Sequence, residues 1–254
     1  MSLWHTTANE NGVQGLPCKP RFALLFTKEL IMPFPLELDH VVVFVSVNAP
    51  EAKTLEALGL KGFGGTTQHG NLGTASTSFF FENTYLELFW VHDEAAATKA
   101  LAPVGFDMSA RINWREAGVS PFGLMLRRRP DAAAPLPFST RRLKAEWMPG
   151  DVFLDFVADN SAEPYYGVAP ESLTYTSFKS NIPDLPHPLG VRRLTQVRIT
   201  VQSNELSPIA QLLTVNGLAT IESGASPLLE LIFDGGAEGK TVDVRPTLPL
   251  VLTC

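Results

Sequence analysis

The alternation of apolar and polar positions becomes regular at residue 38. Leu38 to Val45 is a run of mainly β-branched and aromatic residues, which predicts a β-strand. A helix is expected to begin at Pro50 and to end at Gly59, because an apolar stripe connects the two. A turn-rich segment and two further strands follow, over residues 62–73, 77–81 and 85–91. We assign the order β-α-β-β-β to this module, with three of its four strands located in the sequence.

The same order returns near the C-terminus. The apolar run Leu194 to Val201 lies over Leu38 to Val45 at an offset of 156 residues, and Pro208 lies over Pro50 at an offset of 158. Two later strands are expected over residues 228–233 and 241–244. A repeat at nearly constant spacing indicates two copies of one supersecondary unit.

The alignment of the two copies decides which acidic residue corresponds to Glu87. The letters around Glu230 repeat those around Glu87, but at an offset of 143 that skips a whole strand. Asp243 keeps the offset of 156. We therefore assign Glu230 to the third strand of the second copy and Asp243 to the fourth.

The chain divides into four segments. Three strand-like runs within residues 122–158 have no helix between them and indicate a third, degenerate copy, and a proline-rich connector follows over residues 159–190. The first residues are polar and have no sustained period, so we expect a loose extension, or a true start at Met32. The predicted segments are the extension, the first βαβββ module, the degenerate middle module with its connector, and the second clear module: 1–33, 34–120, 121–190 and 191–254.

Composition and charge exclude several classes of protein. The chain has 254 residues, 45% of them hydrophobic, so a large core is expected and dominant disorder is excluded. A net charge of −6, with only short arginine clusters, argues against a nucleic-acid partner. No apolar run is long enough to span a membrane. The only cysteines, Cys18 and Cys254, show no metal spacing and favour a cytoplasmic location.

Copies of a βαβββ unit, with histidine on the first strand and glutamate on the last, resemble the vicinal oxygen chelate superfamily. The resemblance is strongest to its glyoxalase-like branch, which is related to glyoxalase I, bleomycin-resistance proteins and extradiol dioxygenases. The residues that carry it are Leu38-Asp39-His40-Val41-Val42, Leu58-Gly59-Leu60, Gly64-Gly65, His69, Gly73-Thr74-Ala75, Tyr85-Leu86-Glu87-Leu88 and His187-Pro188-Leu189-Gly190. The resemblance implies an α+β fold in which paired modules form a curved mixed sheet around a pocket.

The resemblance also implies a set of metal ligands on the first and fourth strands of each copy. Carried over by position, these are His40 and Glu87 from one copy and Gln196 and Asp243 from the other. Such donors suit zinc, nickel, manganese or iron. A bound divalent metal would polarise the oxygens of a substrate, and Glu87 is the expected catalytic base.

Two alternatives to this ligand set remain open. The middle module could pair with the first, offering Asp155 on its last strand, but Phe122 and Gly123 occupy the ligand positions on its first strand. A site of two histidines and one carboxylate would need His69, which is also the expected substrate-binding residue.

Two functions are compatible with this sequence. The first is a divalent-metal-dependent enzyme, of lyase, isomerase or dioxygenase type, acting on a small oxygenated metabolite. The alternative is a metal-free protein of the same fold that binds and sequesters a small molecule. The expected partner is a small molecule in both cases, with no nucleic acid and no membrane. A homodimer is compatible with the resemblance, since modules of this fold often pair between chains.

Overall fold

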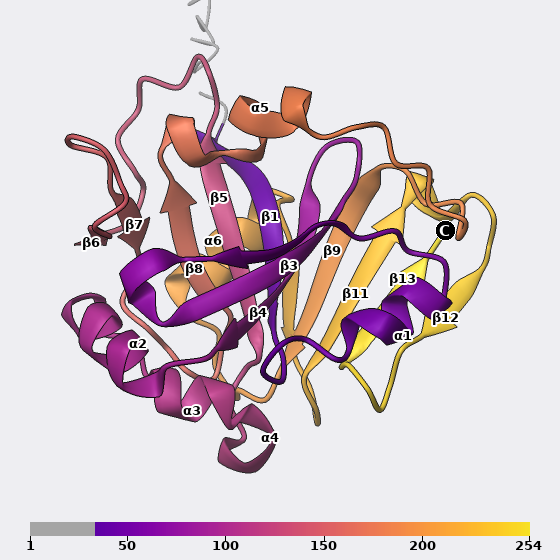
Figure 1. Cartoon of the computed structure of the whole chain (residues 1–254), viewed down its shortest axis with the longest axis horizontal. Helices are drawn as coiled ribbons and strands as arrows, with labels where there is room; N and C mark the ends of the chain where they lie inside the picture. Colours follow the sequence, from indigo (N-terminus) through magenta and orange to yellow (C-terminus); the bar gives the residue numbers. More distant parts are fainter. Residues whose placement is uncertain (1–33) are drawn as a thin grey trace, which may run out of the picture. The chain divides into compact units, whose positions relative to one another are not determined.

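A computed structural model describes residues 34–254 (Figure 1). The predicted N-terminal extension and the alternative start at Met32 lie outside the described residues. The first module has the predicted order, β1 (Leu36–Phe44), α1 (Ala52–Ala57), β2 (Phe63–Gln68), β3 (Thr74–Phe80) and β4 (Tyr85–Val91). Strand β2 lies in the segment whose sequence indicates only turns. Its side chains are mostly exposed on both faces, so it lacks the alternation that marks a half-buried strand.

Three short helices connect the first module to the middle one: α2 (Glu94–Leu101), α3 (Met108–Ile112) and α4 (Trp114–Ala117). The middle module consists of β5 (Phe122–Arg128), β6 (Arg141–Leu143), β7 (Leu154–Phe156) and β8 (Tyr165–Ala169). It has no helix between its first two strands, as predicted for a degenerate copy. Strand β8 lies within the segment assigned to the connector. Asp155 is therefore on the third strand of this module and not on the last.

The first and middle modules share one eight-stranded mixed sheet, in the order β2-β3-β4-β1-β5-β8-β7-β6. Strand β1 runs parallel to β4 and antiparallel to β5. Strand β5 in turn runs parallel to β8. This pairing in the middle module's half of the sheet repeats the β1–β4 pairing of the first module. The middle module, and not the C-terminal one, thus continues the sheet of the first.

The C-terminal segment forms a separate five-stranded sheet (Figure 1). Its elements are β9 (Leu194–Val201), α6 (Pro208–Val215), β10 (Thr220–Ser223), β11 (Leu228–Phe233), β12 (Thr241–Asp243) and β13 (Leu250–Thr253). The predicted strands and helix are present, but the order is β10-β9-β11-β13-β12. Strand β9 pairs with β10 and β11, whereas β12 lies at the edge beside β13. Glu230 lies on the third strand of this copy and Asp243 on the fourth, as assigned, but the strands pair in a different order from those of the first module.

The eight-stranded sheet has two different faces because side chains alternate along each strand. Val41 and Val43 belong to a large core that also contains residues of the five-stranded sheet. Val42 and Phe44 point to the opposite face and belong to a second cluster, with residues of α2 and α3. The predicted α+β class, with repeated modules in a mixed sheet, is confirmed. In the described part of the chain, no helix is long and apolar enough to cross a membrane.

Candidate functional site

A pocket of about 180 Å³ opens on the face of the eight-stranded sheet that the five-stranded sheet does not cover. Its histidines and its carboxylate come from the first module: His40 on β1, Glu87 on β4, and His69 directly after β2. Most of the remaining wall is aromatic or aliphatic. It is formed by Phe44, Leu72, Tyr85, Phe89, Leu101, Phe106, Met108, Met125, Leu143, Trp147, Leu154, Phe156, Tyr165, Ala169 and Leu173.

A bulge in β1 places two consecutive side chains in contact. The register with β5 shifts between Leu38 and His40, so Asp39 has no regular partner there. The His40 Nδ1 atom lies 2.7 Å from Asp39 Oδ2. Neighbouring side chains on a regular strand point to opposite faces, so this contact depends on the bulge.

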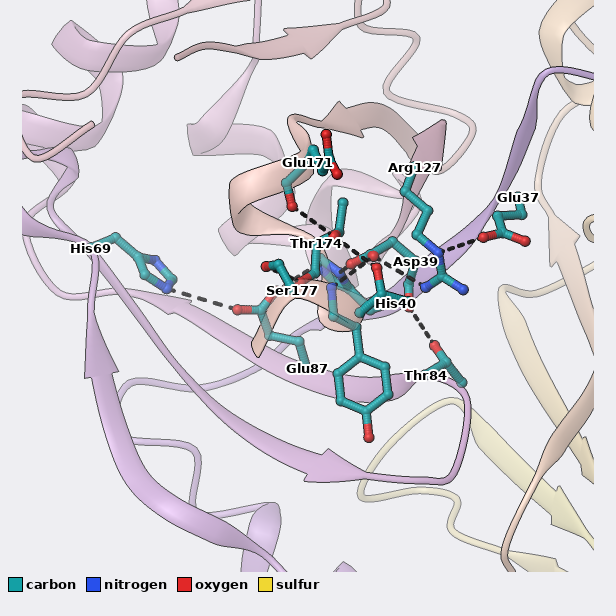
Figure 2. Close-up of polar contacts among 12 residues, drawn as sticks. Glu37, Asp39, His40, His69, Thr84, Glu87, Arg127, Glu171, Thr174 and Ser177 are labelled. Atoms are coloured by element: carbon teal, nitrogen blue, oxygen red, sulfur yellow. Dashed lines mark hydrogen bonds and ion pairs between the residues drawn. The ribbon is translucent and has the colours of Figure 1, made fainter. Parts of the chain in front are cut away.

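Asp39 is fully buried and is held from several sides. Its Oδ1 atom accepts a hydrogen bond from the Tyr175 backbone N–H at 2.9 Å and faces Arg127 Nη1 at 3.3 Å. Arg127 also pairs with Glu37, and the Thr84 hydroxyl donates to the Asp39 carbonyl (Figure 2). These contacts fix the carboxylate that orients the His40 ring.

The Glu87 carboxylate lies between two imidazole rings. His40 Nε2 is 3.4 Å from Glu87 Oε2, and His69 Nε2 is 3.8 Å from Glu87 Oε1. In Figure 2, His69 points toward Glu87 from the segment directly after β2. The His69 ring is held by the hydroxyls of Thr74 and Ser76, at 3.0 Å and 3.2 Å. The predicted residues His40, Glu87 and His69 are therefore brought together at one end of the pocket.

The two imidazoles are driven to opposite protonation states. Burial disfavours the charge of His40, but hydrogen bonds to Asp39 and Glu87 outweigh it and raise its pKa to about 9. Burial lowers the pKa of His69, and the positive charge of His40 reinforces this effect against the attraction of Glu87. For Glu87, burial is outweighed by the hydrogen bond and charge of His40, which lower its pKa to about 2. Near neutral pH, His40 is an imidazolium, His69 a neutral imidazole and Glu87 a carboxylate.

The raised pKa of His40 predicts a pH-dependent contribution to stability. This contribution is complete below the ordinary pKa of 6.5 and is lost as the pH rises through about 9. We expect the difference in unfolding free energy between the wild type and His40→Gln to shrink between these two pH values, as measured by urea denaturation. His92→Gln is the matched control, because it makes the same change at an exposed histidine. A difference that grows above pH 7 would contradict the assignment.

The other two predicted ligands lie on the five-stranded sheet, whereas the cluster lies on the eight-stranded sheet. Gln196 is exposed on β9 of the five-stranded sheet, and Asp243 is exposed on the edge strand β12. Asp243 forms an ion pair with Arg245, whose Nη2 atom lies 2.6 Å from its Oδ2. The structure does not bring these two residues together with His40 and Glu87, because the five-stranded sheet packs against the face of the eight-stranded sheet opposite the pocket.

The donor atoms that remain do not form a metal shell. Within residues 34–254, no group of three or more His, Cys, Asp or Glu side chains is arranged to hold a metal ion. His40 Nδ1 contacts Asp39 at 2.7 Å, so Nε2, which faces Glu87 at 3.4 Å, is the one ring nitrogen directed at the pocket. On the middle module, Met125 is the register partner of His40 and supplies no hard donor. Metal binding stays a prediction.

Two glycines allow apolar side chains of the middle module to occupy its half of the pocket. A Cβ atom at Gly123 would lie 2.3 Å from ring atoms of Tyr165, and one at Gly167 would lie 2.5 Å from the sulfur of Met125. The Tyr165 ring therefore lies over Gly123 of the neighbouring strand, and the Met125 side chain lies over Gly167. A larger residue at either glycine would displace these side chains. This packing makes the second half of the pocket largely hydrocarbon, apart from the hydroxyl of Tyr165.

Replacing Gly123 with alanine is expected to displace the Tyr165 ring and to destabilise the protein. We expect a loss of about 1–3 kcal/mol, the usual range for overpacking a core, measured by urea denaturation. Gly62→Ala is the control, because its nearest obstacle is the flexible end of Glu56 at 3.3 Å. Equal stability of both variants would show that the Tyr165 ring is not packed against Gly123.

A second and larger cavity, of about 630 Å³, is lined mainly by residues 175–192. Its histidine, His187, accepts a hydrogen bond from the Lys61 backbone and faces the Phe80 carbonyl at 2.9 Å. Both ring nitrogens are therefore occupied by backbone groups. This arrangement serves to attach the connector to the sheet, so we take the smaller pocket as the functional site.

Sequence reasoning did not identify Asp39 as a site residue, nor the aromatic wall supplied by Tyr85 and Tyr165. Asp39 was visible as the neighbour of His40, but alternation assigns the two to opposite faces. The Tyr85 ring stacks on His40 at 4.2 Å between centroids. Tyr165 was missed because β8 lies within a segment that its prolines mark as a connector.

Comparisons with known proteins agree with this architecture. A family model described as a glyoxalase-like domain matches residues 38–214, more than half of the chain. A comparison with curated protein sequences finds no match.

Three solved structures match this chain with TM-scores below 0.5. A hypothetical protein from Staphylococcus aureus is 12% identical, with a TM-score of 0.47, over 85% of this chain and 98% of that one. A hypothetical protein from Bacillus halodurans is 16% identical, with a TM-score of 0.34, over 53% and 93%. A mutant of 4-hydroxymandelate synthase from Streptomyces coelicolor is 12% identical, with a TM-score of 0.39, over 87% and 62%.

Proposed function

The chain belongs to the glyoxalase-like domain family, and on that premise we propose that it is an enzyme that moves a proton on a small oxygenated molecule, as an isomerase or lyase. The observation that carries the proposal is the position of Glu87 between the imidazole rings of His40 and His69 in a pocket. A pair of groups whose pKa values are pushed apart is the arrangement expected of an acid and a base that act together.

Each of the three side chains has a distinct role in this proposal. The protonated His40 turns its Nε2–H, which faces Glu87 at 3.4 Å, toward a substrate oxygen and stabilises negative charge as it develops there. The neutral His69 accepts a proton from the adjacent carbon. In the tautomer that donates Nδ1–H to the Thr74 hydroxyl, Nε2 carries the lone pair for this step. The Ser76 hydroxyl, 3.2 Å from Nε2, must then donate to Glu87 instead. Glu87 then stabilises the imidazolium that forms on His69.

The role of Glu87 differs from that expected of a base. A carboxylate whose pKa is about 2 is too weakly basic to take a proton from carbon near neutral pH. Its negative charge instead offsets the charge on whichever imidazole is protonated. Asp39 is a positioning residue, since it holds His40 through Nδ1 and turns Nε2 toward the pocket.

A binding and sequestering function is the second candidate. It is favoured by the middle module, whose contribution to the pocket is largely hydrocarbon and includes no carboxylate or imidazole. Such a protein would hold the same kind of molecule without changing it. The two candidates differ in one measurable property, the exchange of a substrate proton with solvent.

Deuterium exchange tests the proposal. The full chain is incubated in D₂O with 2-hydroxyacetophenone, an uncharged α-hydroxyketone with one ring, and the CH₂ proton signal is followed by NMR. We expect catalysed exchange that persists in EDTA and is lost in His69→Gln. Exchange that disappears with EDTA and returns with zinc or manganese would replace this proposal with metal-dependent catalysis. Binding of this compound without exchange would favour sequestration.

A further inference from the structure

The pocket is polar at one end and apolar at the other. His40, His69 and Glu87 lie on the side of the first module, next to the hydroxyl of Thr74. The side formed by the middle module presents Met125 and Phe156. A molecule that fills this space must place its hydrogen-bonding atoms at one end and hydrocarbon at the other, because buried polar groups without partners are costly.

The volume of the pocket limits the size of that molecule. At about 180 Å³, the pocket is close to an apolar protein cavity of about 150 Å³ that accommodates benzene. Met125 closes it on one side, packed so tightly that Gly167 has no room for a Cβ atom. Trp147 lies beside the opening, where its Nε1–H donates to the His69 carbonyl at 3.2 Å. One six-membered ring with a short substituent fits this space and leaves little room for a larger body.

The charges around the pocket limit the charge of the molecule. No lysine or arginine is among the described residues that line it. The imidazolium of His40 already faces two carboxylates, Asp39 and Glu87. The nearest guanidinium on this network, Arg127, is itself paired with Glu37 and Asp39. A carboxylate on the ligand would meet the negative charge of Glu87 with no free cation to compensate it.

We infer that the site takes an uncharged molecule of single-ring size, with a hydrogen-bonding oxygen at one end and a hydrocarbon body at the other. This inference rests on the pocket of the proposed function and adds the substrate class to it. The oxygen lies against His40 and the hydrocarbon against Met125 and Phe156.

Calorimetric titration of the full chain with three probes tests this class. The probes are benzyl alcohol, benzoate and 2-naphthylmethanol, which vary charge and size around one ring. We expect benzyl alcohol to bind at least about tenfold more tightly than benzoate, a difference of about 1.4 kcal/mol. We expect 2-naphthylmethanol not to bind. Shifts in the NMR signals of the His40 and His69 rings on addition of benzyl alcohol locate its binding in this pocket.

Two variants separate charge from size. Glu87→Gln is expected to reduce the preference for benzyl alcohol over benzoate, because it removes the repelling charge. Met125→Ala is expected to admit 2-naphthylmethanol, whereas Met125→Leu, which keeps most of the volume, is not. Benzoate binding as tightly as benzyl alcohol to the wild type would overturn the assignment of charge. Tight binding of 2-naphthylmethanol would overturn the assignment of size, and no saturable binding of benzyl alcohol up to its solubility would overturn both.

These results are independent of the exchange assay. If benzyl alcohol shows the expected preference while no exchange of 2-hydroxyacetophenone occurs, the substrate class stands and the proposed proton transfer fails. If exchange occurs while benzoate is preferred, the proton transfer stands and the substrate class fails.

Discussion

Replacing Glu87 with glutamine is expected to lower the rate of deuterium exchange into 2-hydroxyacetophenone by at least about 100-fold, the lower range for loss of acid–base assistance. Glutamine has nearly the same shape as glutamate but carries no charge. His40 would lose one of the two carboxylates that raise its pKa, and the protonated form of His69 would lose its counter-charge. The exchange rate, measured by NMR in the presence of EDTA, reports both losses together.

Glu222→Gln is the matched control for this substitution. Glu222 is exposed on β10 of the five-stranded sheet. Its variant therefore makes the same chemical change on the sheet that does not carry the pocket. The control is expected to exchange at the wild-type rate. An undiminished rate in Glu87→Gln, with the fold intact by circular dichroism, would remove Glu87 from the proposed chemistry.

Replacing Arg111 with alanine is expected to have the largest effect on stability, a loss of about 3–5 kcal/mol of unfolding free energy. Arg111 lies on α3 and is completely buried. Its guanidinium donates to the Ser120 carbonyl at 2.8 Å, to the Glu163 carbonyl at 3.1 Å and to the carboxylate of Asp159. Without it, the Asp159 carboxylate stays buried with no opposite charge. Urea denaturation measures the loss.

Arg129→Ala provides the comparison, because Arg129 is exposed and is expected to change stability by less than about 0.5 kcal/mol. A second variant isolates the charge. The double variant Arg111→Met with Asp159→Leu removes both partners of the ion pair. It is expected to recover part of the lost unfolding free energy, because no unpaired ion remains. A loss below about 1 kcal/mol in Arg111→Ala would show that water reaches Asp159.

Local sequence pattern was sufficient to predict half of the site. His40 and Glu87 lie on strands with strong apolar alternation, and each strand fixes which side chains share a face. The structure brings them together by pairing β1 with β4 in parallel, and the resemblance had indicated this only by placing ligands on both strands. His69 was found through the same resemblance, although the strand before it was not.

The other half depends on pairing and packing that sequence spacing does not encode. Asp243 keeps a constant offset from Glu87, but β12 pairs with β13 and not with β9. An offset counts residues along the chain, whereas a site depends on which strands are neighbours. Asp39 joins the site only because β1 has a bulge, and a bulge is fixed by the partner strand β5.

The most direct test of the central claim is the protonation state of the two imidazoles. Histidine ring signals of the full chain, followed by NMR as a function of pH and assigned with His40→Gln and His69→Gln, give both pKa values. We predict that His40 is protonated at pH 7 and titrates near pH 9, and that His69 is neutral at pH 7 with a pKa below 6.5. Two histidines that titrate together near pH 6.5 would contradict the acid–base pair on which the proposed function stands.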